Sequence, residues 1–273
     1  MSTQYFEHDG GRIAFDDTGD GPLVVCVPGM GDVRAEYRFL TPQLVSAGYR
    51  VVTMDVRGHG ETSVGWSDVS VAAIGSDILA LIRRLNAGPA IIVGTSMAAG
   101  AAVCVAAKAP QAVTGLVLIG PFVRDTMPGW QRAAMFGTMF RRPWGVSVWS
   151  RYFATLFPTA RPADWETYTA AQKNNLREKG RLDALRGMML ASKQASEAAL
   201  SKVNAPTLVI MGTKDPDFNE PAAEARLVAE RLDGRVQMID GAGHYPHAEM
   251  PAPTASAILG FLGRLQEAER HVA

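Results

Sequence analysis

A serine, an aspartate and a histidine occupy positions from which an alternation of strands and helices would bring them together. Ser96 lies in the pentapeptide 94–98 (GTSMA), between a predicted strand and a predicted helix. Asp215 lies four residues past a later predicted strand, and His244 lies in the glycine-rich stretch 241–246 after the last one. A serine hydroxyl activated by a histidine, which an acid orients in turn, is a nucleophile for acyl transfer. The order Ser96, Asp215, His244 therefore predicts a catalytic triad.

The pentapeptide around Ser96 fits a sharp turn from strand to helix. Such a turn lifts the serine hydroxyl above the carboxyl edge of a sheet, and small neighbours let strand and helix pack closely. The helix N-terminus behind the serine favours negative charge near its amides. Ala98 stands where the turn usually has glycine, which adds one methyl group. The same residues also fit a serine that merely N-caps an ordinary helix.

Other acids and histidines compete for the two supporting roles. Asp217 is the fallback for the acid, whereas Asp125 is disfavoured because Pro121 and a long insertion follow its strand. His59 lies in a sequence typical of a tight turn, and His247 fits a surface or loop-bracing position. The other two histidines lie near the chain ends, at His8 and His271.

The pentapeptide also resembles the serine motif of subtilisin-like proteases. Asp17 and His59 would even supply the order Asp, His, Ser of that family. The spacing excludes this interpretation, because only 37 residues separate His59 from Ser96. Roughly 150 separate the two in subtilisin-like enzymes.

Several unlinked motifs, taken in order, resemble those of the α/β-hydrolase fold. They are PGMG at 28–31, DVRGHG at 55–60, GTSMA at 94–98, GTKD at 212–215 and GH at 243–244. The resemblance extends from Leu23 to about Leu265, although Pro28 stands where the family usually has histidine. It implies an acyl-enzyme on Ser96 and an oxyanion hole made by the backbone amides of Met30 and Met97. It implies neither a metal ion nor an organic cofactor.

The elements that must position these residues alternate between strands and helices. Apolar runs predict strands at 23–27, 49–54, 90–93, 113–119, 207–211 and 236–239. Helical spacing predicts helices at 35–47, 71–85, 97–109 and 221–232, and one that ends at about 269. This alternation predicts a parallel sheet, and strands so uniformly apolar must be covered on both faces. We therefore expect an α/β class protein with a mostly parallel, doubly wound sheet.

The alternation stops between residues 121 and 200, where we expect an inserted helical cap on a core of residues 1–120 and 201–273. This segment holds eleven of the 21 aromatic residues, and twelve basic against six acidic ones. We expect most of its large apolar side chains to form a core of the cap and about one in four to reach substrate. They are Met127, Trp130, Met135, Phe136, Met139, Phe140, Trp144 and Trp149. We expect its basic residues to lie on solvated faces.

Composition narrows the classes of partner and compartment. The 273 residues carry 27 basic and 27 acidic side chains, so no net field favours nucleic acid or an anionic membrane. The N-terminal sequence lacks the apolar run of a signal peptide, and no stretch is long enough to span a membrane. Cys26 and Cys104 lie in apolar surroundings typical of buried thiols. We expect a cytoplasmic protein that acts on a small molecule, without nucleic acid or membrane, and the oligomeric state is open.

These observations favour a serine hydrolase that cleaves a small or medium apolar carboxylic ester, or a lactone. A related serine hydrolase of another bond is the alternative: a C–C bond of a diketone-like substrate, a thioester, or a reaction that forms a peroxyacid. The serine–methionine pair of the turn does not choose among these, since one fold supports many chemistries. A ligand receptor with little turnover is a third hypothesis.

Overall fold

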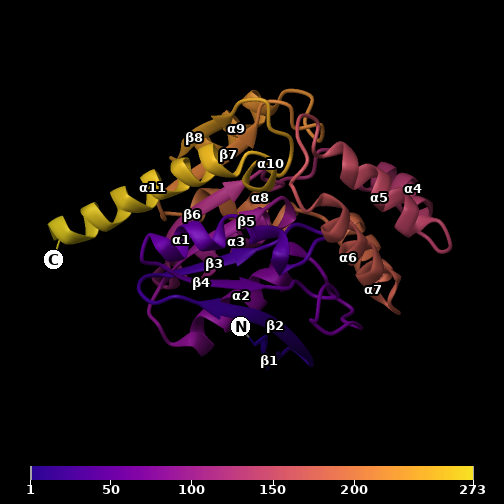
Figure 1. Cartoon of the computed structure of the whole chain (residues 1–273), viewed down its shortest axis with the longest axis horizontal. Coiled ribbons are helices and arrows are strands. Elements are labelled where there is room, and N and C mark those ends of the chain that lie inside the picture. Colours follow the sequence, from indigo (N-terminus) through magenta and orange to yellow (C-terminus); the bar gives the residue numbers. More distant parts are fainter. Residues whose placement is uncertain (1, 273) are drawn as a thin grey trace.

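Within residues 2–272, which the computed structural model describes, an eight-stranded sheet forms the centre of the molecule (Figure 1). Its strand order is β1-β2-β4-β3-β5-β6-β7-β8. The strands from β3 to β8 run parallel, whereas β1 and β2 form an antiparallel hairpin that pairs with β4. The strands are β1 (Gln4–His8), β2 (Gly11–Thr18), β3 (Leu23–Val27), β4 (Arg50–Met54), β5 (Ala90–Thr95), β6 (Val113–Ile119), β7 (Thr207–Gly212) and β8 (Arg235–Ile239). The mostly parallel sheet of the sequence prediction is confirmed.

Helices cover both faces of the sheet. One face packs against α2 (Val71–Leu85), α3 (Met97–Lys108) and α9 (Pro221–Arg231). The other face packs against α1 (Thr41–Ser46) and α11 (Pro251–Val272). In β3, Leu23, Val25 and Val27 enter the first core, while Val24 and Cys26 enter the second. This alternation is why the strand reads as an uninterrupted apolar run.

Five helices lie between β6 and β7: α4 (Gly129–Met139), α5 (Gly145–Thr155), α6 (Trp165–Arg177), α7 (Arg181–Leu190) and α8 (Gln194–Ala199). The first four project from one side of the sheet (Figure 1), and we call α4–α7 the inserted helices. Their buried aromatic and aliphatic side chains form a separate core that includes Trp149, Phe153 and Trp165. The short α8 instead packs against α2 and α3.

Three details differ from the predicted elements. The hairpin of β1 and β2 was missed, although Asp9 (φ 48°) and Gly10 (φ 76°) form the Asp-Gly turn that favours tight hairpins. The single helix predicted at 35–47 was wrong, because a 3₁₀ turn, Arg34–Tyr37, precedes a separate α1. Pro42 is the second residue of α1, in keeping with the preference of proline for the first helical turn. Pro251 likewise separates α10 (Pro246–Glu249) from α11.

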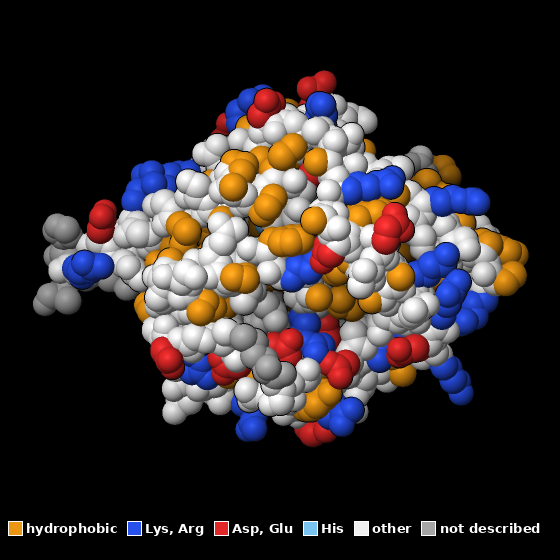
Figure 2. All heavy atoms as spheres, in the orientation of Figure 1, with side chains coloured by type: hydrophobic (Ala, Val, Ile, Leu, Met, Phe, Trp, Pro, Cys, Tyr) orange, Lys and Arg blue, Asp and Glu red, His pale blue; other side chains and the backbone are white. Residues whose placement is uncertain are grey.

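The surface agrees with the balanced composition. On the face in Figure 2, acidic and basic side chains alternate, and Lys and Arg gather on the right, where the inserted helices lie in Figure 1. No helix within the described residues has the length and apolar content required to cross a membrane.

Candidate active site

Ser96 occupies a strained turn between β5 and α3. Its backbone has φ 57° and ψ −120°, a region that residues other than glycine rarely adopt. The turn is held on both sides, because the Ser96 N–H donates to the Ile119 carbonyl at 2.8 Å and its own carbonyl accepts from Phe122 at 3.1 Å. Gly94 is required here, since a Cβ at that position would lie 2.7 Å from the Ala98 carbonyl oxygen. Strand and helix therefore pack as closely as the pentapeptide predicted.

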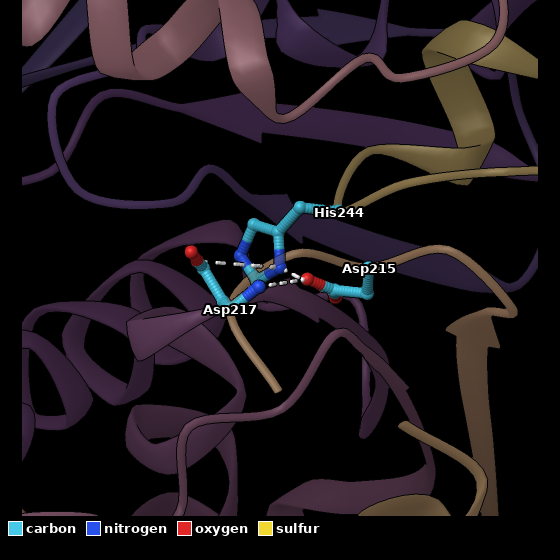
Figure 3. Close-up of side chains that lie close together, drawn as sticks. All are labelled: Asp215, Asp217 and His244. Carbon is cyan, nitrogen blue, oxygen red and sulfur yellow. Dashed lines mark hydrogen bonds and ion pairs between the residues drawn. The ribbon is translucent and has the colours of Figure 1, made fainter. Parts of the chain in front are cut away.

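His244 and Asp215 meet at the carboxyl ends of β7 and β8 (Figure 3). The Nδ1 atom of His244 lies 2.7 Å from Asp215 Oδ2, and both side chains are buried. Burial opposes the charged form of His244, but the carboxylates of Asp215 and Asp217 outweigh it and raise its pKa to about 9. The backbone N–H of His244 donates to the Leu156 carbonyl at 3.0 Å, which ties the loop after β8 to the end of α5. In its neutral form, an imidazole so held can accept a proton at Nε2.

Asp217, the fallback acid, lies beside the same ring. Its Oδ2 is 3.7 Å from His244 Nδ1, and its backbone N–H donates to Asp215 Oδ1 at 3.0 Å. The hydroxyl of Tyr152, from α5, donates to Asp217 Oδ1 at 2.6 Å. Asp125 is held elsewhere, by Arg132, Ser192 and the backbone of Lys193.

Ser96 and His244 line the same cavity, which has a volume of about 340 Å³. Most of the wall is apolar, as is usual for small-molecule sites. Six of the eight large apolar residues of the insertion line it: Met127, Met135, Phe136, Met139, Phe140 and Trp149. The other two, Trp130 and Trp144, are 72% and 52% exposed. The inserted helices thus supply much of the cavity's apolar wall.

The loop before Met30 adjoins the serine. A Cβ on Gly29 would lie 3.3 Å from the Ser96 Cβ atom. On either side of Met30, the Gly29 N–H donates to Glu36 Oε2 at 2.8 Å and the Gly31 N–H donates to His59 Nε2 at 3.1 Å. Met30 itself lines the cavity. Met97 is the first residue of α3, and the first N–H groups of a helix have no partner within the helix.

A family model described as the alpha/beta hydrolase fold matches residues 22–251. The chain is an α/β hydrolase. It is 30% identical over 274 residues to the candidate non-heme bromoperoxidase BpoC of Mycobacterium tuberculosis, covering 93% of this chain and 99% of that one. It is 27% identical to the 2-(acetamidomethylene)succinate hydrolase of Mesorhizobium japonicum, covering 93% of each chain. Among solved structures, a thermophilic esterase from Thermogutta terrifontis has a TM-score of 0.81 at 22% identity, covering 97% of this chain and 99% of that one.

Two histidines of this α/β hydrolase brace loops. His59 Nδ1 lies 2.9 Å from the Arg57 carbonyl, so Nδ1 carries the proton and Nε2 accepts from Gly31. Burial lowers the pKa of His59 to about 4, which keeps it neutral. His247 is also buried, so a surface position was wrong, and its Nε2 lies 3.0 Å from Glu36 Oε1.

Two residues close to His244 and Asp217 were missed from sequence. A Cβ on Gly120 would lie 2.9 Å from the Nδ1 and Cε1 atoms of His244, so only glycine leaves the ring in place. Its position directly after β6 was the available signal. Tyr152 had no such signal, because it lies 65 residues from Asp217.

The donor atoms of Asp215, Asp217 and His244 lie within 4.8 Å of one another, a separation that could suit a metal ion. Each acid is already engaged, however, Asp215 with the histidine and Asp217 with Tyr152. Both carboxylates therefore have protein partners without a metal ion.

Proposed function

We propose that this α/β hydrolase is a serine hydrolase that cleaves small or medium apolar carboxylic esters, or lactones, through an acyl-enzyme on Ser96. One observation carries the proposal: the strained Ser96 and the Asp215-bound His244 line one apolar cavity. Strain at a residue other than glycine persists where the surroundings impose it, and it gathers at active sites.

In the proposed mechanism, His244 Nε2 takes the proton of the Ser96 hydroxyl as its oxygen attacks the acyl carbonyl. Asp215 holds the imidazole in the tautomer with its proton on Nδ1 and stabilises the cation that forms. The backbone amides of Met30 and Met97 donate to the oxyanion. His244 then protonates the leaving alkoxide and activates the water that releases the acid.

We further propose that residues 121–200 act as a cap on a core of residues 1–120 and 201–273. The cavity is near the small end of ligand pockets and mostly apolar, which favours an acyl group of modest length. We also propose a small-molecule substrate without nucleic acid or membrane. The unpaired thiols Cys26 and Cys104 support a reducing compartment, the cytoplasm.

A peroxyacid-forming reaction is the second candidate, favoured by the 30% identity to a protein named as a non-heme bromoperoxidase. In it, hydrogen peroxide replaces water in attacking the acyl-enzyme. The ester bond to Ser96 breaks, the serine regains a proton, and a peroxyacid leaves. Adding peroxide and carboxylic acid, then measuring peroxyacid formation, tests this reaction separately from hydrolysis.

The direct test is initial-rate hydrolysis of p-nitrophenyl esters of graded chain length. Wild type should turn over steadily, and Ser96→Ala should abolish turnover while retaining its circular dichroism spectrum. Ser201→Ala, at an exposed serine, is the matched control and should retain the wild-type rate. Inert but folded wild type would overturn ester hydrolysis, and a single slow event per ligand would indicate a receptor instead.

A further inference from the structure

Two carboxylates face the Nδ1 edge of His244, although a triad needs only one. Asp215 Oδ2 makes the hydrogen bond at 2.7 Å, and Asp217 Oδ2 lies 3.7 Å away (Figure 3). The Asp217 side chain is only 11% exposed, and it lines the cavity that Ser96 also lines. A nearly buried acid so close to the base needs a reason, because burying a charge without a partner is costly.

The partner of that second acid comes from the inserted helices. The Tyr152 hydroxyl donates to Asp217 Oδ1 at 2.6 Å and leaves Oδ2 toward His244. Tyr152 also packs against Trp149, with ring centroids 5.4 Å apart, so its position depends on α5. Asp217 is thus aligned by a residue outside the sheet.

We propose that Asp217 is a second acid partner of His244 and that Tyr152 positions it, so that the inserted helices set the strength of the catalytic base. The effect of Asp217 on turnover rests on the proposed function, whereas its contacts with His244 and Tyr152 do not.

Electrostatics gives the direction of the effect. An opposite charge within about 4–6 Å favours the charged form of a histidine by about 1–3 pKa units. Burial raises the pKa of Asp217, and the nearby Asp215 carboxylate adds to that rise, whereas His244 and the Tyr152 hydroxyl lower it. Three other polar residues act on the His244 ring. They are Asp215, which shares a loop with Asp217, Glu36 from the 3₁₀ turn, and the adjacent Tyr245. Asp217 should therefore strengthen the base beyond what Asp215 alone provides.

The test compares wild type, Asp217→Asn, Tyr152→Phe and the double variant. The first measurement is the pH profile of kcat/KM on a p-nitrophenyl ester. The second is the titration of the His244 ring by NMR without substrate, with its signal assigned from its absence in His244→Asn. The matched control is Asp125→Asn, which removes an acid from the same cavity that bonds to Arg132 instead.

In Asp217→Asn, the acid limb of the kcat/KM profile and the midpoint of the His244 NMR titration should both move down by about 1 pH unit or more. The plateau value of kcat/KM should fall several-fold. Tyr152→Phe should move both midpoints in the same direction as Asp217→Asn, but by less. The double variant should show the same midpoints as Asp217→Asn alone. Asp125→Asn should leave both midpoints close to those of wild type, because Asp125 pairs with Arg132 and not with His244.

Unchanged midpoints in Asp217→Asn would overturn the proposal, and so would additive shifts in the double variant, since independent roles add. If Asp217→Asn fails to fold, Tyr152→Phe alone decides by its own midpoint. If wild type hydrolyses no ester, the NMR titration still decides, because it needs no turnover. Failure of the proposed function is thereby distinguished from failure of this inference.

Discussion

Gly29 and Glu36 are joined by a buried hydrogen bond, in which the Gly29 N–H donates to the carboxylate at 2.8 Å. Glu36 is only 1% exposed, and its other oxygen lies 3.0 Å from His247 Nε2. The chain beyond Gly29 leads directly to Met30, whose amide is proposed to bind the oxyanion. The buried acid therefore fixes the path of this loop.

Replacing Glu36 by alanine should loosen the loop and leave a buried N–H without its acceptor. We expect a loss of about 1–3 kcal/mol in the free energy of unfolding, measured with urea. We also expect kcat to fall on the order of 10²-fold, because small displacements of positioned groups are costly in rate. Glu36→Gln, which keeps an acceptor for Gly29, should lose less of both. Equal kcat in wild type and Glu36→Ala would contradict the positioning role.

Gly120→Ala should impair turnover more than it impairs folding. The new Cβ would lie 2.9 Å from His244 Nδ1, so the ring must move away from Asp215. A fall in kcat/KM of about 10²-fold or more is expected. Gly48→Ala is the matched control, because Gly48 also has a positive φ, 86°, but no atom lies within 4 Å of its added Cβ. Comparable losses of activity in both variants would show that backbone strain, not the histidine, is responsible.

The raised pKa of His244 predicts how stability depends on pH. The folded state holds this proton up to about pH 9, whereas an unfolded histidine releases it near pH 6.5. The group therefore stabilises the folded state fully below pH 6.5, and this contribution is lost as pH rises through 9. The difference in unfolding free energy between wild type and His244→Asn should shrink by about 3 kcal/mol between pH 6 and pH 10. Urea unfolding at both pH values checks this, and a constant difference would argue against a charged His244 at neutral pH.

Phe136→Ala should change which esters are preferred. Phe136 lies on α4 and lines the cavity, so its removal enlarges the space for an acyl chain. The optimum in a p-nitrophenyl ester series should move to longer chains, with little change for acetate. Trp130→Ala on the same helix is the control, because Trp130 is 72% exposed and does not line the cavity. If Phe136→Ala prefers the same ester chain length as wild type, the inserted helices do not select the substrate.

Local patterns were sufficient to predict most of the fold. The uninterrupted apolar strands and the strand-to-helix turn at Ser96 are encoded by neighbouring residues, so periodicity and small side chains reveal them. Asp215 and His244 were predictable for the same reason, since each lies in the loop after a strand whose carboxyl end is at one edge of the sheet. The edge hairpin was harder, because β1 and β2 carry too few apolar residues for the strand pattern to stand out.

Long-range contacts account for what was missed. Tyr152 reaches Asp217 across 65 residues, and no local pattern distinguishes it from the other aromatic residues of the insertion. The role of Glu36 depends on a loop that folds back to Gly29 and on His247, which comes from the far end of the chain. The large apolar residues of α4 are of the types that usually fill a core. Only the packing of the inserted helices decides which of them face the cavity.

Ser96 is proposed to be the nucleophile, and His244 the base that activates it. Incubation with a fluorophosphonate, which reacts with activated serines, followed by peptide mass spectrometry tests this proposal most directly. We expect one label per chain, located on Ser96, with labelling lost in Ser96→Ala and strongly slowed in His244→Asn. Labelling of another residue, or an unreactive Ser96 in folded wild type, would contradict it.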